Sequence, residues 1–89
     1  MGVYRKRPVE IEAFRWTGGP DQEEDPVWAV EAIKDGRMYF QGGHEPYMTI
    51  ETLEGKMRAN VGDWIIRGVK GELYPCRDDI FQATYERVG

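Results

Sequence analysis

The residues best suited to chemistry lie between positions 62 and 81, in the stretch GDWIIRGVKGELYPCRDDIF. A tight turn at Lys70-Gly71 would pair Arg67 with Tyr74 across a hairpin, because glycine supplies the positive φ that such turns require. A guanidinium beside an aromatic ring can hold a phosphate and stack on a base. The same pair can equally be a cation–π contact on a solvated hairpin face, worth about 0.5 to 1 kcal/mol. Both interpretations remain open.

Five residues are predicted to bind a ligand, and each carries a positive charge or an aromatic ring. Arg67, Lys70 and Tyr74 are the expected contacts, and Arg58 and Arg77 are outer candidates. Guanidinium groups bind phosphate through paired hydrogen bonds, so the expected ligand is a small anion such as a nucleotide.

Cys76 and His44 are the residues that could supply a nucleophile and its base. A nucleophilic cysteine needs a base within reach and a third group that orients that base, and no feature of the sequence places His44 there. Lone cysteines are usually small buried hydrophobes. One cysteine and one histidine cannot form a structural zinc site, which takes four ligands. We therefore predict no catalytic residue, no metal and no cofactor.

Asp63 stands directly after Gly62 at the start of a predicted strand. Aspartate in this position often accepts hydrogen bonds from nearby backbone N–H groups. We expect Asp63 to fix a turn rather than to act as a general base.

Composition narrows the class of protein. The formal net charge of −4 argues against binding along a nucleic-acid backbone, which requires a basic footprint. No apolar run approaches the ~18 residues of a membrane span, so no membrane partner is expected. The single cysteine cannot form an internal disulfide, which favours a reducing cytoplasm. The length fits one domain spanning 1–89.

Two short strands and a loop are predicted in the first half of the chain. The alternation in VEIEAFRW, residues 9–16, is typical of a half-buried strand, and it breaks at Phe14, where a bulge or a strand end is expected. The glycine-rich and acidic residues 17–25 predict a loop. RMYF, at 37–40, predicts another strand.

Residues 25–36, DPVWAVEAIKDG, predict a short helix that Asp25 caps and Gly36 ends. A helix this short needs to dock on a sheet to persist in water. Its apolar side is expected to hold Val27, Val30 and Ile33, with Trp28 and Ala29 beside them.

Two hairpins are predicted in the second half. In the first, a two-residue turn at Glu54-Gly55 sets Glu51 opposite Arg58 and separates apolar from polar residues between the two faces. The apolar face holds Met48, Ile50, Thr52, Met57, Ala59 and Val61. In the second, the Lys70-Gly71 turn gathers Trp64, Ile66 and Leu73 as a core set and leaves Ile65, Arg67, Val69, Glu72, Tyr74 and Cys76 on the other face. Asp78 is expected to cap a turn that leads into a closing extended segment.

These elements indicate an α+β fold, with one short helix packed on a small curved antiparallel sheet or open barrel built from two hairpins. So small a chain buries a thin core, and we expect a homo-oligomer. A leftover apolar face of Trp16, Trp28 or Tyr39 would mark its interface.

The stretch GDWIIRGVKGELYPCRDDIFQATYE, preceded by TLEGKMRANV, resembles small uncharacterised proteins encoded by bacteriophages and prophages. Those proteins often carry a Pro-Gly-Asp-aromatic motif, which stands here as Val61-Gly62-Asp63-Trp64, with the proline replaced. VEIEAFRWTG and WAVEAIKDGRMYF fit the resemblance as well, so it covers most of the chain. The resemblance implies a phage accessory gene, but it assigns no activity and no catalytic residues to this chain.

Three functions fit these observations. The first is a non-enzymatic accessory binding protein in the host cytoplasm, which counters host defence by sequestering a nucleotide signal or by occupying a host protein. The second is a small enzyme that acts on a nucleotide or a modified protein through Cys76 or Asp63. The third is a minor virion or assembly component.

Overall fold

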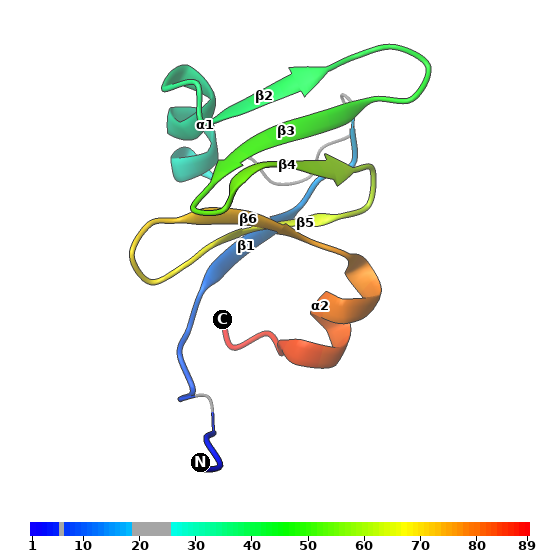
Figure 1. Cartoon of the computed structure of the whole chain (residues 1–89). Helices are drawn as coiled ribbons and strands as arrows, with labels where there is room; N and C mark the ends of the chain where they lie inside the picture. Colours follow the sequence, from blue (N-terminus) through cyan, green and yellow to red (C-terminus); the bar gives the residue numbers. More distant parts are fainter. Residues whose placement is uncertain (6, 19–25) are drawn as a thin grey trace.

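The computed structural model describes residues 1–5, 7–18 and 26–89, which form two helices and two antiparallel three-stranded sheets (Figure 1). The predicted α+β class is confirmed. The elements in chain order are β1 (Glu12–Arg15), α1 (Val27–Lys34), β2 (Met38–Gln41), β3 (Tyr47–Thr52), β4 (Gly55–Asn60), β5 (Trp64–Arg67), β6 (Leu73–Cys76) and α2 (Asp78–Thr84). Helix α2 stands where a capped turn was expected, and the predicted cap Asp25 lies outside the described residues.

The two sheets have the strand orders β1-β5-β6 and β2-β3-β4, and β6 packs against β3 and β4. Between them lies a core of residues from every strand and from α1. Its buried members are Phe14, Trp16, Ala29, Ala32, Met38, Met48, Ile50, Ala59, Ile65 and Leu73. Phe14, where a strand end or bulge was expected, is paired with Ile65 inside β1. The described part of the chain contains no helix long and apolar enough to cross a membrane.

The β3–β4 hairpin separates its two faces as predicted, but its register is shifted by two residues. Ile50 pairs with Met57 and Glu51 with Lys56, where Ala59 and Arg58 were expected. The hydroxyl of Thr52 accepts a hydrogen bond from the backbone N–H of Glu54 (3.1 Å) and donates one to the carbonyl of Gly55 (2.6 Å). These bonds fix the turn at residues 53–54, one position earlier than predicted. Because side chains alternate with a period of two, the shift leaves each residue on its predicted face.

Helix α1 packs through its smallest side chains. Ala29 and Ala32 are buried, because alanine lets the helix approach the sheet closely, and the Trp28 ring lies 5.5 Å from the Phe14 ring. The predicted apolar side, Val27, Val30 and Ile33, is exposed instead. Trp16 is buried in the core and Trp28 packs against it, so these two rings do not form the leftover apolar face that was expected.

The sheet β1-β5-β6 is covered on both faces. Ile65 belongs to the core between the sheets, whereas its neighbour Ile66 points the other way and is also fully buried. Trp64, on the same face as Ile66, stacks on Phe81 of α2 with ring centroids 4.0 Å apart. Helix α2 therefore covers this outer face (Figure 1).

Candidate functional site

Arg67 and Tyr74, the predicted centre of the ligand site, lie on opposite faces of the β5–β6 hairpin. Arg67 pairs with Leu73, and Tyr74 pairs with Ile66. The loop has three residues, 69–71. The N–H of Gly71 donates a hydrogen bond to the carbonyl of Gly68, which closes a turn, and Gly71 then adopts a φ of +82°. A two-residue loop was expected, and the extra loop residue moves the register by one position. Every residue of β6 then faces opposite to the prediction.

Each of these two side chains has a partner of its own. Arg67 Nη1 lies 3.7 Å from Glu12 Oε1 on β1. Tyr74 faces α2 and the residues after it, where burial, and then a hydrogen bond with Tyr85, raises the pKa of its phenol to about 12. Lys70 is exposed in the loop between β5 and β6. The structure therefore does not bring Arg67, Lys70 and Tyr74 together.

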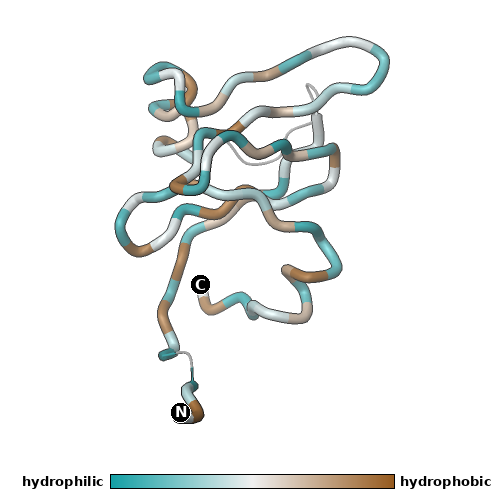
Figure 2. Tube along the Cα trace, viewed as in Figure 1, coloured by the Kyte–Doolittle hydropathy of each residue, from teal (hydrophilic) through white to brown (hydrophobic). Residues whose placement is uncertain are grey.

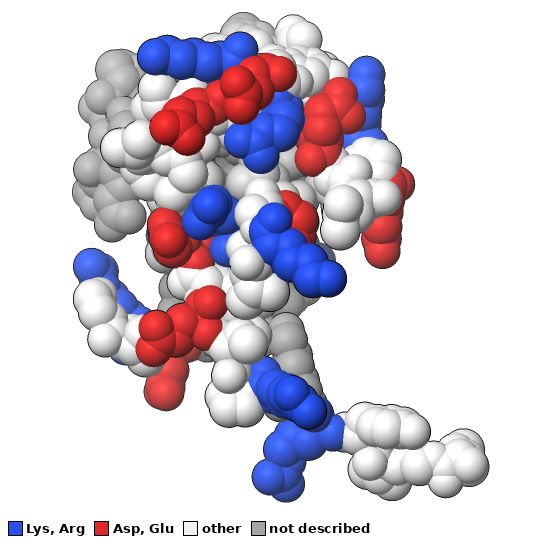
Figure 3. All heavy atoms as spheres, turned by 90° about the vertical axis from the view of Figure 1, so that its left-hand side faces the viewer, with Lys and Arg blue, Asp and Glu red and all other residues white. Residues whose placement is uncertain are grey.

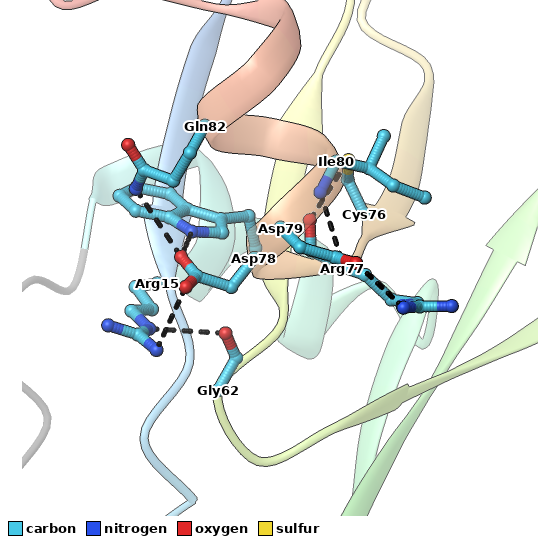
Figure 4. A network of polar contacts seen from close by, with 9 residues as sticks. Arg15, Gly62, Cys76, Arg77, Asp78, Asp79, Ile80 and Gln82 are labelled. Carbon is cyan, nitrogen blue, oxygen red and sulfur yellow. Dashed lines mark hydrogen bonds and ion pairs between the residues drawn. The ribbon is translucent and has the colours of Figure 1, made fainter.

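Arg77 also has a carboxylate partner. It is the N-cap residue of α2, and its Nη2 lies 2.7 Å from Asp79 Oδ2 (Figure 4). Asp79 in turn accepts a hydrogen bond from the backbone N–H of Ile80. This short-range pair holds the start of the helix.

Arg58 differs from Arg67 and Arg77, the other two predicted arginines. Its guanidinium lies 4.0 Å from the centre of the Tyr47 ring, and its Nε donates a 3.0 Å hydrogen bond to Asn60 Oδ1. Arg58 faces Thr49 across the β3–β4 ladder, and Tyr47 is the diagonal neighbour on the same face. The ring and the amide hold the guanidinium plane over the sheet. No carboxylate among the described residues pairs with it, whereas Arg15, Arg37, Arg67 and Arg77 each have one.

A second aromatic and basic pair continues this surface. Tyr39 of β2 pairs with Thr49, so it lies on the same face as Tyr47 and Arg58. A hydrogen bond with Tyr39 raises the pKa of Lys56 above its usual value, and Glu51 lies 3.9 Å from the Lys56 ammonium. We call this outer face of β2-β3-β4 the tyrosine face, and it carries Tyr39, Gln41, Tyr47, Thr49, Glu51, Lys56, Arg58 and Asn60.

The sequence prediction named Arg58 but missed Tyr47 and Tyr39. The predicted register set Glu51 opposite Arg58, which would have neutralised the arginine. Thr52 was the signal for the correct register, because threonine hydroxyls close turns by bonding to backbone groups two residues on. With the turn placed from Thr52, the diagonal contact between Tyr47 and Arg58 follows directly.

The Gly62-Asp63-Trp64 motif has a structural role. Asp63 Oδ2 accepts a 2.8 Å hydrogen bond from the backbone N–H of Asn60, as predicted for a residue that fixes a turn. The Trp64 indole donates a 2.8 Å bond to Asp78 Oδ1, which also accepts one from Gln82, and Arg15 lies 3.6 Å from Asp78 Oδ2 (Figure 4). The bonds from Trp64 and Gln82 lower the pKa of Asp78. The motif thereby attaches α2 to the sheet.

Cys76 is in a poor setting for a nucleophile. Burial, together with the carboxylates of Asp63 and Asp79, raises the pKa of its thiol, whereas a reactive cysteine needs a lowered one. Cys76 pairs with Trp64 rather than with Ile65, and its sulfur contacts the carbonyl of Arg77. His44 lies in the turn between β2 and β3. Within the described ranges, no group of three or more His, Cys, Asp or Glu side chains could hold a metal ion.

Two open grooves border β6. One, of about 370 Å³, runs between the β3–β4 turn and β6 and is lined by Thr52, Leu53, Glu54, Met57, Glu72, Leu73, Tyr74 and Pro75. The other, of about 350 Å³, is lined by residues before β1, the β5–β6 loop and the end of α2. We call the first the inter-sheet groove. Its lining is apolar, and its two charged side chains, Glu54 and Glu72, are both acidic.

The chain matches no protein-family model, and no similar curated protein and no similar solved structure was found.

Proposed function

We propose that this chain is a non-enzymatic binding protein that holds a nucleotide-like anion on the tyrosine face. The observation that carries the proposal is the Arg58 guanidinium, held 4.0 Å from the centre of the Tyr47 ring and without a carboxylate partner among the described residues. An anion that binds Arg58 displaces no acid, whereas one that binds Arg67 or Arg77 must compete with Glu12 or Asp79.

The chemistry of the face matches two parts of a nucleotide. Bases stack on guanidinium planes as well as on aromatic rings, so the side of Arg58 that faces away from Tyr47 can receive a base. The guanidinium edge can bind phosphate oxygens, and Asn60 and Thr49 offer neutral hydrogen-bonding groups. The Lys56 ammonium can add a second positive charge, for which the anion competes with Glu51, 3.9 Å away. One or two bases fit such a small surface better than a long strand, in keeping with the net charge of −4.

The wider biological role rests on the sequence resemblance to phage accessory proteins. A small protein of this kind in the host cytoplasm acts by occupancy: it removes a nucleotide signal on which host defence depends. The raised pKa of Cys76 supports this role over the enzymatic alternative.

A thermal-shift screen tests the proposal. The purified chain is mixed with cyclic di- and trinucleotides, ADP-ribose derivatives and nucleoside phosphates. A ligand at one hundred times its dissociation constant adds about 2.7 kcal/mol, a clear shift for a domain of this size. If no class shifts the melting temperature, the nucleotide proposal is wrong.

Matched variants then locate the site. Arg58→Ala is expected to weaken binding at least about tenfold, since one charge-assisted contact is worth about 1.5 to 3 kcal/mol. Arg58→Lys keeps the charge but loses the plane, so it should bind at an intermediate level. Arg67→Ala is the control, because Arg67 pairs with Glu12 and lies outside the tyrosine face, and it should bind like the wild type. Loss of binding in Arg67→Ala alone would place the site on the β5–β6 hairpin instead.

A further inference from the structure

Residues 1–5 and 7–11 form an arm that leaves the start of β1 and extends away from both sheets (Figure 1). The arm gives the molecule its elongated shape, 47 × 24 × 23 Å. Its base, from Arg7 to Ile11, lines the second groove together with the β5–β6 loop, Glu72 and Tyr85 of the same copy. Its tip, residues 1–5, is exposed at every position.

The composition of the arm tip is unusual for a solvated segment. Met1, Val3 and Tyr4 are at least 92% exposed, and Figure 2 shows hydrophobic segments along the arm. Arg5 and Arg7 add positive charge, and Figure 3 shows the basic side chains of the arm at the bottom of the view. No ion pair among the described residues includes either arginine.

The inter-sheet groove has the complementary properties. Leu53 is 86% and Met57 41% exposed at its wall, with Leu73 and Pro75 on the opposite side. Glu54 and Glu72 are its charged residues, and the ion pairs formed within the described residues use neither. An apolar groove with unpaired acids therefore exists in the same molecule as an apolar arm with unpaired arginines.

We propose that the arm tip of one copy docks in the inter-sheet groove of a second copy, and that two copies exchange arms in a symmetric homodimer. Met1, Val3 and Tyr4 cover the apolar wall formed by Leu53, Met57, Leu73 and Pro75. Arg5 and Arg7 lie against Glu54 and Glu72. Exchange of an identical segment is a common route to a dimer, because each arm meets a groove that already exists on its partner.

Sedimentation velocity of charge-reversed variants tests this proposal. The wild type is expected to sediment as a dimer at tens of micromolar. The arm variant Arg5→Glu/Arg7→Glu and the groove variant Glu54→Lys/Glu72→Lys should each be monomers with wild-type circular dichroism. The control Lys34→Glu/Arg87→Glu, with the same change of charge outside the arm, should remain a dimer.

Mixing the two monomeric variants is the decisive measurement. The basic arms of the groove variant match the acidic grooves of the arm variant, and the acidic arms match the basic grooves. A one-to-one heterodimer is therefore expected. A monomeric wild type, a dimer that persists in both variants, or a mixture that stays monomeric would each overturn arm exchange.

Discussion

The two sheets of this protein differ in their outer faces: one is open to solvent and the other is covered by a helix. The sheet β2-β3-β4 buries one face in the core, and its other face, the tyrosine face, is open to solvent. The sheet β1-β5-β6 buries one face in the core and covers the other with α2, so that Ile65 and Ile66 are both fully buried. Arg58, on the open face, stacks on a ring, whereas Arg67 and Arg77 pair with acids. This difference is the reason for placing the proposed binding site on the open sheet rather than on the covered one.

The largest effect on stability is expected at Ile66, on the covered face of β5. Its replacement by alanine should lower the free energy of unfolding by about 2 to 5 kcal/mol, as for a core isoleucine, because α2 and its neighbours exclude water from that face. Urea denaturation measures the change. Thr49→Ala, at the corresponding outer position of β3, serves as the control and should cost below about 0.5 kcal/mol. Equal small costs for both would show that α2 does not cover its face.

Tyr74 offers a test at high pH. Its pKa is raised to about 12, so the folded state favours the neutral phenol. The stability that Tyr74 contributes is complete below pH ~10 and is lost as the pH rises toward 12. Absorbance titration should show one late-ionising tyrosine that disappears in Tyr74→Phe, while Tyr47→Phe leaves it in place. Ionisation of Tyr74 together with the exposed tyrosines would contradict a covered face.

Asp78 provides the corresponding test in acid. Its pKa is lowered by hydrogen bonds from Trp64 and Gln82, so its contribution to stability is present above the unfolded pKa, about 3.9, and is lost as the pH falls below it. Asp78→Asn should therefore be less stable than the wild type at neutral pH. Urea denaturation in acid should find the two proteins closer together. A difference that is the same at both pH values would mean that the charge of Asp78 has no part in holding α2.

The smallest expected effect concerns the paired arginine of the covered sheet. Arg67→Ala should change the free energy of unfolding by at most about 1 kcal/mol, because its partner Glu12 and Arg67 itself are both solvent-exposed. Chemical denaturation with Glu12→Ala and the double variant gives the coupling between them. A coupling well above that value would show that the pair is a main support of β1.

The two hairpins also show which part of the fold could be predicted from the sequence. The faces of β3–β4 were predicted correctly because a shift of two residues preserves the alternation, and Asp63 was assigned its turn contact from position alone. The predicted register of the β5–β6 hairpin was wrong, because Gly71 is the third residue of its loop rather than the second. With Ile65 and Ile66 both buried, the apolar pattern could not reveal the error.

The same burial on both faces explains why the ligand site predicted around Arg67 and Tyr74 was wrong. A sheet that is covered on both sides has no polar face that a pattern can identify, so Arg67 and Tyr74 were placed together when they lie apart. Helix α1 presents a related case, since its alanines face the core while larger apolar residues remain outside. Size, and not hydrophobicity alone, decides which side of a short helix packs closely.

Pro75 has a further consequence for how the chain behaves in a crowded solution. The hydrogen bond from Gly68 N–H to Glu72 makes 66–74 and 64–76 the bonded pairs of the β5–β6 ladder, so the backbone nitrogen of residue 75 faces outward. β6 is an edge strand, and proline removes a donor that an added strand would need. Concentrated solutions should consequently resist fibril growth along this edge, and a nonproline residue at position 75 would offer a template for it.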